Sequence, residues 1–307
     1  MIYEPMLAQP LDYERDRDGN PTFSEPQWQW DAEPKLDGIR CVLYLSQQSI
    51  HNHALTRVRG KHTGKYADKA AHIPWLDFPM WEAVLDGELT WGKNSRETME
   101  ILGCHPTEAW NRQALHGDVH FTAFDLLKVG EQDHRFYTYE QRRESLLMLV
   151  SEMSHPRIHA IEQWSARMLW ARITRDKGEG IMLKAPMHQY QVGRRSTDWM
   201  KAKRFRKFIA VVTGFQWGKK GKTGQMEGLM GSLSVSMLNK DGILIHVGDV
   251  GTGFAMAERS PGAWPMRTVV EVESSDVTED LQLWHPVFRH RRPDLRIEDA
   301  KYEQILS

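Results

Sequence analysis

The sequence contains little cysteine and no long hydrophobic run. Only Cys41 and Cys104 occur among its 307 residues, which excludes a four-thiolate zinc site and a framework of several disulfides. No stretch approaches the roughly 18 consecutive apolar residues of a membrane span. The amino-terminal segment MIYEPMLAQP also lacks the basic and apolar pattern of a signal peptide. We therefore expect a protein of the reducing cytoplasm with no membrane partner.

An excess of charge of one sign is also missing, because 40 basic residues stand against 41 acidic residues. The charges are nevertheless segregated along the chain. The segment 194–207, RRSTDWMKAKRFRK, holds seven basic residues and a single acidic one. Two further basic clusters lie at Lys219, Lys220 and Lys222 and at Arg289, Arg291 and Arg292. Local positive stretches in a neutral chain fit a protein that binds a polyanion, although a solvated surface explains any single cluster equally well.

The first two thirds of the chain contain the sequence patterns of both strands and helices. Short apolar runs predict strands at 28–31, 39–45, 83–85 and 121–124. Helical patterns lie between and after them, with Ser95 as a cap, Thr138 and Gln141 as a capping box, and Ser165 as another start. This combination of strands and helices predicts a mixed α+β domain over residues 1–206.

After residue 206 the sequence pattern changes to short runs of apolar or alternating apolar and polar residues, separated by Gly, Asn and Asp-Gly turns. These runs lie at 209–217, 233–238, 242–250 and 268–274. The pattern is typical of an all-β module, and an OB-like barrel is the expected architecture for residues 207–307.

The segment Lys35-Leu36-Asp37-Gly38-Ile39-Arg40 is the first candidate for chemistry, because it places a lysine in a turn between two predicted strands. A lysine attacks phosphorus only as the neutral amine, so its pKa must fall below the usual value of about 10.4. Nearby cations and partial burial both have that effect. Taken alone, the segment is explained as well by a surface Asp-Gly turn.

Four other short motifs follow in order along the chain. They are Asp86-Gly87-Glu88, Phe124-Asp125, the segment 179–184 (EGIMLK) and the segment 199–203 (WMKAK). Each has a structural explanation: a turn, a core residue followed by a polar one, or a solvated strand face. The order in which they occur is more informative than any one of them.

That order resembles the covalent nucleotidyltransferase superfamily and, within it, the ATP-dependent DNA ligases of the compact bacteriophage type. The resemblance covers most of the chain, from the PMLA segment at 5–8 to the carboxy-terminal barrel. It implies an α+β fold, in which an ATP-grasp-like nucleotidyltransferase domain of antiparallel sheets and helices, residues 1–206, precedes an OB-fold domain, residues 207–307. It also implies an enzyme that forms a lysyl-AMP intermediate and seals 5′-phosphate/3′-hydroxyl nicks.

The resemblance assigns roles residue by residue. Lys35 corresponds to the nucleophile that carries AMP. Glu33 and Phe124 correspond to the adenine contacts, Arg40 and Glu88 to the ribose contacts, and Lys201 and Lys203 to the pair that grips the α-phosphate. The nucleotide site further includes Arg57, in preference to Arg59, and Arg194. Glu179, with Glu88 as a second ligand, corresponds to the carboxylate that positions Mg²⁺ or Mn²⁺.

In the predicted barrel, the basic glycine-rich loop 217–222 with Lys219, Lys220 and Lys222 resembles a DNA-binding loop of these ligases. Near the end, the family has an R-x-D-K element that orients the pyrophosphate leaving group. Here it corresponds to Arg292-Pro293-Asp294-Leu295, in which Leu295 replaces the lysine. With no segment ahead of Tyr3 for a separate DNA-binding domain, the two domains are expected to bind nicked double-stranded DNA themselves, as a monomer, without sequence preference.

Other classes of protein share part of this pattern. An mRNA capping enzyme also combines K-x-D-G with an OB fold, but Glu33 and the PMLA segment favour the DNA ligases. An RNA ligase commonly lacks the barrel, and an NAD-dependent ligase needs cysteines that are missing here. A non-catalytic OB-fold protein that binds nucleic acid would leave the ordered motifs unexplained.

Overall fold

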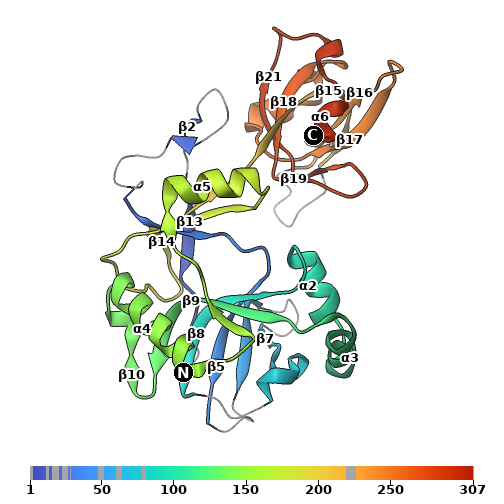
Figure 1. Cartoon of the computed structure of the whole chain (residues 1–307). Coiled ribbons are helices and arrows are strands. Elements are labelled where there is room, and N and C mark those ends of the chain that lie inside the picture. Colours follow the sequence, from blue (N-terminus) through green and yellow to red (C-terminus); the bar gives the residue numbers. More distant parts are fainter. Residues whose placement is uncertain are drawn as a thin grey trace. The chain divides into compact units, whose positions relative to one another are not determined.

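The computed structural model describes residues 3–11, 14–15, 21–22, 27, 29–47, 52–59, 64–77, 81–218 and 226–306 (Figure 1). The chain folds into two compact units. The first runs to Lys203, except for a short segment beginning at Arg15 that belongs to the second, and the second continues from Arg204. The domain boundary predicted from the sequence lies three residues later, after residue 206.

The first unit contains two large sheets. One has five strands in the order β1-β14-β13-β4-β12, in which β1 runs parallel to β14 and the other neighbours are antiparallel. Its strands are β1 (Leu7–Pro10), β4 (Asp31–Pro34), β12 (Trp164–Ser165), β13 (Gly180–Lys184) and β14 (Arg195–Lys203). Strands from the beginning and the end of the unit thus lie side by side.

The second sheet of this unit has the order β10-β9-β8-β5-β6-β7, with β11 parallel to β9. Its strands are β5 (Ile39–Leu45), β6 (His53–Arg59), β7 (Tyr66–Asp68), β8 (Ala83–Thr90), β9 (His120–Val129), β10 (Gln132–Asp133) and β11 (Ile158–Ala160). A separate short pair is formed by β2 (Glu14–Arg15) and β3 (Pro21–Thr22).

The helices lie mostly in the first unit, and their first turns follow from the sequence. They are α2 (Ser95–Leu102), α3 (Pro106–His116), α4 (Tyr139–Met153) and α5 (Ala166–Arg175), with α6 (Glu303–Leu306) in the second unit. The capping box of Thr138 and Gln141 and the cap at Ser165 are confirmed. The cap of α2 was predicted wrongly: Asn94, whose side chain accepts from Glu97 N, takes the place expected for Ser95.

Short 3-10 turns connect these elements. They are η2 (Ala70–His72), η3 (Pro74–Leu76), η4 (His134–Phe136), η5 (Met256–Arg259), η6 (Pro261–Ala263) and η7 (Ile297–Asp299).

The second unit is built on a five-stranded antiparallel sheet in the order β17-β16-β15-β18-β21. Its strands are β15 (Arg206–Trp217), β16 (Met230–Leu238), β17 (Leu244–Val250), β18 (Val269–Ser274) and β21 (Val287–Arg291), and a small pair joins β19 (Asp276–Val277) to β20 (Leu283–Trp284). The four runs predicted as strands all lie in this sheet. Their buried side chains form one core together with Trp264, Leu283, Phe288 and Ile305 from other segments of the unit.

Two early predictions in the first unit require correction. The strand predicted at 28–31 begins only at Asp31 and continues to Pro34. The Asp86-Gly87-Glu88 motif, for which a turn is the simple explanation, lies in the middle of β8. Position 87 has no room for a side chain, because a Cβ atom there would lie 2.3 Å from Cζ of Phe121. The glycine therefore lets two strands pack closely and leaves its acidic neighbours on the strand.

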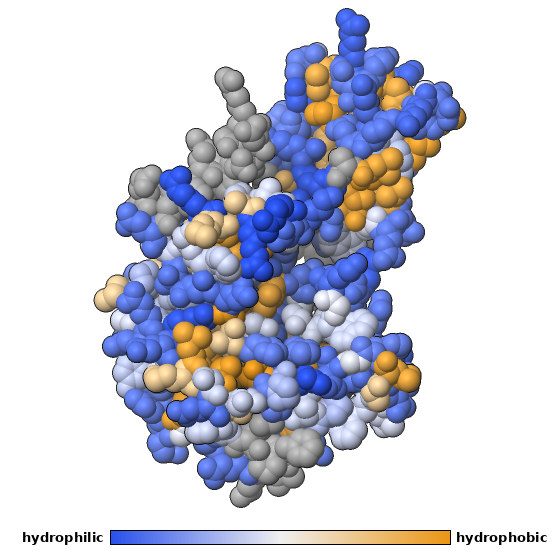
Figure 2. All heavy atoms as spheres, viewed as in Figure 1, coloured by the Kyte–Doolittle hydropathy of each residue, from blue (hydrophilic) through white to orange (hydrophobic). Residues whose placement is uncertain are grey.

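Within the part of the chain that the structure describes, no helix is long and apolar enough to cross a membrane. On the face shown in Figure 2, hydrophilic side chains cover most of each unit and hydrophobic ones gather in small groups. Isolated hydrophobic side chains on a surface are normal for a folded protein.

A buried ion pair joins helix α4 to strand β9. The Arg142 guanidinium donates to Asp125 from Nε at 2.6 Å and from Nη2 at 2.9 Å, and both side chains are almost fully buried. Its Nη1 donates to the carbonyls of Tyr137 and His188. The network is therefore satisfied as long as both charges are present, and the loss of one leaves the other uncompensated.

We predict that Asp125→Asn lowers the free energy of unfolding of the first unit by about 3–5 kcal/mol, because Arg142 keeps its buried charge without a counter-ion. The measurement is urea unfolding followed by circular dichroism. As a matched control, Asp118→Asn breaks the partly exposed pair with Arg157 and should cost less than about 1 kcal/mol. Equal effects of the two substitutions would contradict this account.

Candidate active site

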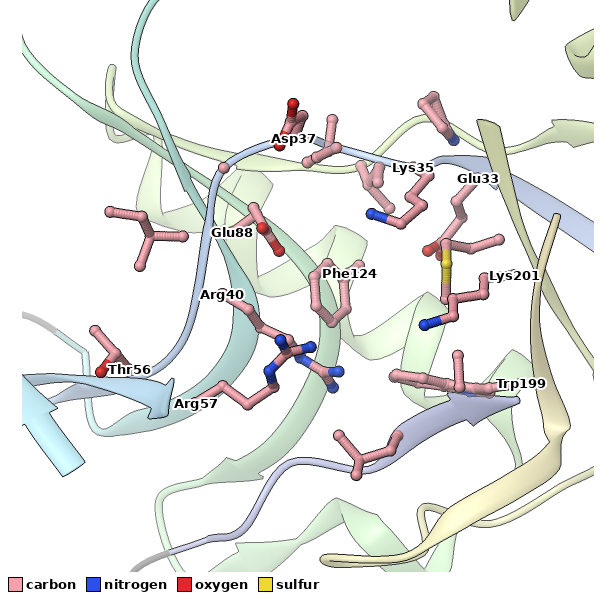
Figure 3. A pocket seen from close by; sticks show the side chains of 18 of the residues that line it. Glu33, Lys35, Asp37, Arg40, Thr56, Arg57, Glu88, Phe124, Trp199 and Lys201 are labelled. Carbon is pink, nitrogen blue, oxygen red and sulfur yellow. The ribbon is translucent and has the colours of Figure 1, made fainter. Parts of the chain in front are cut away.

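The first unit contains a cavity of about 620 Å³ between its two sheets, a size suited to a nucleotide-sized molecule (Figure 3). Its walls come from segments far apart in the sequence. Among the predicted site residues, those that line it are Glu33, Lys35, Arg40, Arg57, Glu88, Phe124, Lys201 and Lys203. The separate motifs of the sequence therefore meet around one space.

Lys35 lies in the loop between β4 and β5, where the sequence predicts it. Its backbone N–H donates to the carbonyl of Gly180 at 2.9 Å, which fixes the loop against the start of β13. Its ammonium donates to Oε2 of Glu179 at 2.7 Å, and Nζ of Lys203 lies 3.0 Å from Oε1 of the same carboxylate. One carboxylate thus joins the two lysines, and the Lys35 amine lines the cavity instead of pointing into bulk solvent.

Several further cations crowd the same side of the cavity. The pKa of Lys201 is lowered, first by burial and then by the charges of its neighbours Lys203, Lys35, Arg195 and Arg57. In Figure 3, the side chains of Lys35, Lys201 and Arg57 all point into the space around the Phe124 ring. Such a concentration of positive charge is suited to an anion with several charges, such as a polyphosphate.

Strand β14 supplies part of this cluster through its alternation. Residues Arg195, Trp199, Lys201 and Lys203 line the cavity, at spacings of two or four along the strand. Side chains of a strand that are an even number apart share a face. Arg194, predicted at the nucleotide site, is not among the lining residues, and the structure points to Arg195 in its place. Arg195, unlike its neighbour Arg194, lies an even number of residues before Lys201 and Lys203 and therefore shares their face.

A hydrogen-bonded network fixes Arg40. Its Nε and Nη2 donate to Asp86 at 3.1 and 2.7 Å, and Nη2 also donates to the Met6 carbonyl at 2.7 Å. The Tyr190 hydroxyl donates to the same Asp86 carboxylate at 2.6 Å and accepts from Met6 N. Burial alone lowers the pKa of Arg40, but the Asp86 carboxylate raises it above its ordinary value. Arg40 is therefore a fixed cation in the wall of the cavity.

Glu88 also faces the cavity, beside Arg40 in Figure 3. Burial raises its pKa to about 7, against the opposing influence of Lys35, Arg40 and the backbone N–H of Gly38. Gly38 approaches so closely that a Cβ atom would lie 2.3 Å from the carbonyl oxygen of Leu89. The attraction of Lys35 and Arg40 thus does not fully offset the cost of burying the charged Glu88 carboxylate.

The rest of the cavity wall is aromatic and apolar. The rings of Phe124 and Trp199 meet edge to face at a centroid distance of 6.0 Å, and Met182 and Ile161 line the same cavity. The polar groups here are Glu33 and Lys184, both about 1% exposed, which form an ion pair of 2.7 Å. A flat apolar wall with a few fixed polar groups is the usual environment of a bound base.

The acidic residues of the site are its candidate ligands for a metal ion. Within the described residues, no group of three or more His, Cys, Asp or Glu side chains is arranged to hold a metal ion. Mg²⁺, however, is commonly bound by one or two carboxylates together with substrate phosphates. Glu88, which lines the cavity, and Glu179, whose two oxygens pair with Lys35 and Lys203 of the cavity wall, are hard oxygen donors of the kind that this arrangement uses.

Arg292 of the second unit already has partners of its own. It donates to Asp294 from Nε and Nη2, the latter at 2.6 Å, and Nη1 donates to Glu271 at 3.0 Å. The Arg-Pro-Asp motif therefore forms an internal ion pair in this structure. Lys219, Lys220 and Lys222 lie outside the described residues.

Comparison with known proteins identifies relatives of this chain. The family model of the ATP dependent DNA ligase domain matches residues 5–203. The bifunctional non-homologous end joining protein LigD of Bacillus subtilis is 26% identical over 251 residues, which are 76% of this chain and 39% of that protein. The chain spans less than two thirds of the length of the first curated relatives that it matches.

Solved structures of ligases share the fold. A structure from a study of Lig E DNA ligases matches 95% of this chain and all of its own, with a TM-score of 0.65 and 24% identity. The ligase domain of M. tuberculosis LigD matches 97% of both chains, with a TM-score of 0.50 and 23% identity. The predicted α+β class, a nucleotidyltransferase domain followed by an OB fold, is confirmed. With a family model that matches most of the first unit, the chain belongs to the family of ATP-dependent DNA ligase domains.

Proposed function

We propose that this protein is an ATP-dependent DNA ligase that seals nicks in duplex DNA through a covalent Lys35-AMP intermediate. The observation that carries this proposal is the position of the Lys35 amine in the cavity, joined through Glu179 to Lys203 and surrounded by further cations. A nucleophile among several cations is what phosphoryl transfer requires, because positioning and charge stabilisation supply most of the rate.

In the first step, Nζ of Lys35 attacks the α-phosphorus of ATP. A nitrogen–phosphorus bond forms, the bond from the α-phosphorus to the bridging oxygen breaks, and pyrophosphate leaves while the amine loses its proton to solvent. Lys201, Lys203, Arg57 and Arg195 stabilise the negative charge of the phosphates. This role suits them because they crowd around Lys35 on the same side of the cavity.

The remaining groups of the cavity orient the nucleoside. Phe124 stacks against the adenine, near the polar pair of Glu33 and Lys184. Arg40, held by Asp86 and Met6, and the carboxylate of Glu88 contact the ribose hydroxyls. Glu179 and Glu88 would hold Mg²⁺ or Mn²⁺, which supplies charge neutralisation for the phosphates.

In the later steps, AMP passes from Lys35 to the 5′-phosphate at a nick. The 3′-hydroxyl then attacks that phosphate, the phosphodiester bond forms and AMP leaves. The protein acts as a monomer on nicked duplex DNA, with phosphate contacts from the basic segment 194–207 and from Lys219, Lys220 and Lys222. Arg292 orients the pyrophosphate.

We expect Lys35→Ala to abolish covalent labelling of the protein by α-labelled ATP and Mg²⁺. Wild-type protein should carry label that survives denaturation at neutral pH, which a chase with nicked DNA removes. The readout is a denaturing gel before and after the chase. Label that persists in Lys35→Ala would show that another residue is the nucleophile, and label from GTP instead of ATP would point to a capping enzyme.

Lys203→Ala should reduce the rate of Lys35-AMP formation by about 10²–10³-fold, because it removes one preorganised cation from the phosphates. Its circular dichroism spectrum should match that of the wild type. Lys128→Ala is the matched control, since among the described residues this lysine forms a long pair with Glu131, 3.9 Å away on the surface. A wild-type rate in Lys203→Ala would exclude the proposed contact with phosphate.

A further inference from the structure

The first two turns of helix α4 contact three separate segments of the cavity wall. Tyr139 donates to Glu33 of β4, Arg142 pairs with Asp125 of β9, and Nη2 of Arg143 donates to the carbonyl of Ile161. Glu33 and Ile161 line the cavity, as does Phe124, the residue next to Asp125. The capping box of Thr138 and Gln141 fixes the start of this helix. One helix end thus holds together the aromatic and apolar part of the site.

The contact of Tyr139 with Glu33 is the most direct of the three. The Tyr139 hydroxyl donates to Oε1 of Glu33 at 2.5 Å, and Nζ of Lys184 lies 2.7 Å from Oε2 of the same carboxylate. All three side chains are about 1% exposed. Both carboxylate oxygens therefore have a donor, and neither donor can be replaced by bulk water.

Lys184 extends this arrangement into the cavity. Its ammonium donates to the carbonyl of Phe124 at 2.7 Å and lies 4.4 Å from the centroid of the Trp199 ring and 5.0 Å from that of Phe124. An ammonium has three N–H donors, and Glu33 and the Phe124 carbonyl account for two. Lys184 lines the cavity beside these rings, so its place relative to a stacked base depends on where Glu33 holds it.

We propose that Tyr139 is a positioning residue for the nucleotide base: its hydroxyl fixes the Glu33 carboxylate, which in turn fixes the Lys184 ammonium against the ring of Phe124. Without the hydroxyl, Oε1 of Glu33 becomes a buried acceptor with no donor, and the carboxylate rotates or moves to regain one. Lys184 follows its counter-ion, because a separated buried pair is strongly unfavourable. The polar edge offered to the base then changes while Lys35 and the phosphate cations stay in place.

This inference rests on the proposed function, since it takes the aromatic part of the cavity as the site of the adenine. A merely structural role of Tyr139 makes a different prediction. It would lower stability and the rate for every nucleotide alike, whereas a positioning role alters the discrimination between bases and leaves the discrimination between sugars intact.

The test compares Tyr139→Phe with wild type in the formation of Lys35-AMP from ATP, inosine triphosphate and 2′-deoxyATP. Inosine differs from adenosine only at the base edge and deoxyadenosine only at the sugar. For Tyr139→Phe we expect the KM for ATP to rise about tenfold, as the loss of one hydrogen bond to a charged group would cause, with the maximal rate within about twofold. The preference for ATP over inosine triphosphate should fall about tenfold, and the preference for ATP over 2′-deoxyATP should not change.

Tyr137→Phe is the matched control, because it removes a tyrosine hydroxyl two residues earlier that, within the described part of the chain, accepts a hydrogen bond from the exposed Gln132 side chain. Its KM values should equal those of the wild type. Tyr139→Phe keeps the buried ring, its fold is checked by circular dichroism, and should its stability be reduced the comparison of nucleotides is repeated at a temperature at which the variant is folded.

The outcomes separate the two proposals. Absence of label on the wild type with every nucleotide would contradict the proposed function itself. Normal labelling of the wild type, with unchanged base preference in Tyr139→Phe, would overturn the role of Tyr139 alone. An equal shift for inosine triphosphate and 2′-deoxyATP would also overturn it.

Discussion

Repulsion among like charges is the constraint on which the site depends. Lys35, Lys201 and Lys203 lie within one cavity with three arginines, and such a group would separate if nothing opposed it. Carboxylates hold the cations: Glu179, just before β13, holds two of the lysines, and Asp86 of β8 holds Arg40 of β5. Each sheet thus fixes its own cations by ion pairs, and because residues of both sheets line the cavity, the site exists only where both sheets are complete.

Much of this arrangement could be predicted from the sequence, because local patterns determine it. The lysine loop between two strands, the capping box of α4 and the strands of the second unit all follow from turn chemistry and hydrophobic period. The order of short motifs indicated which segments meet. The eight predicted residues that line the cavity were identified in this way.

Other features could not be predicted, because they depend on contacts between distant segments. Nothing near Tyr139 or Tyr190 in the sequence indicates that their hydroxyls contact Glu33 and Asp86, 106 and 104 residues away. Lys184 ends a recognised motif, yet its burial becomes visible only in the fold. Arg195 is a further example. The alternation of a strand shows which residues share a face, but one residue of known position is needed to decide which of the two faces lines the cavity.

The strand order of the first sheet has a consequence for biosynthesis. Strands β13 and β14, which give the Lys35 loop its backbone partner and the cavity its lysines, are the last of the unit to leave the ribosome. A nascent chain that ends before them contains Lys35, the proposed nucleophile, but not its surroundings, and non-local pairings of this kind form late. The emerging polypeptide therefore carries Lys35 without its backbone partner and without Lys201 and Lys203 until strand β14 has left the ribosome.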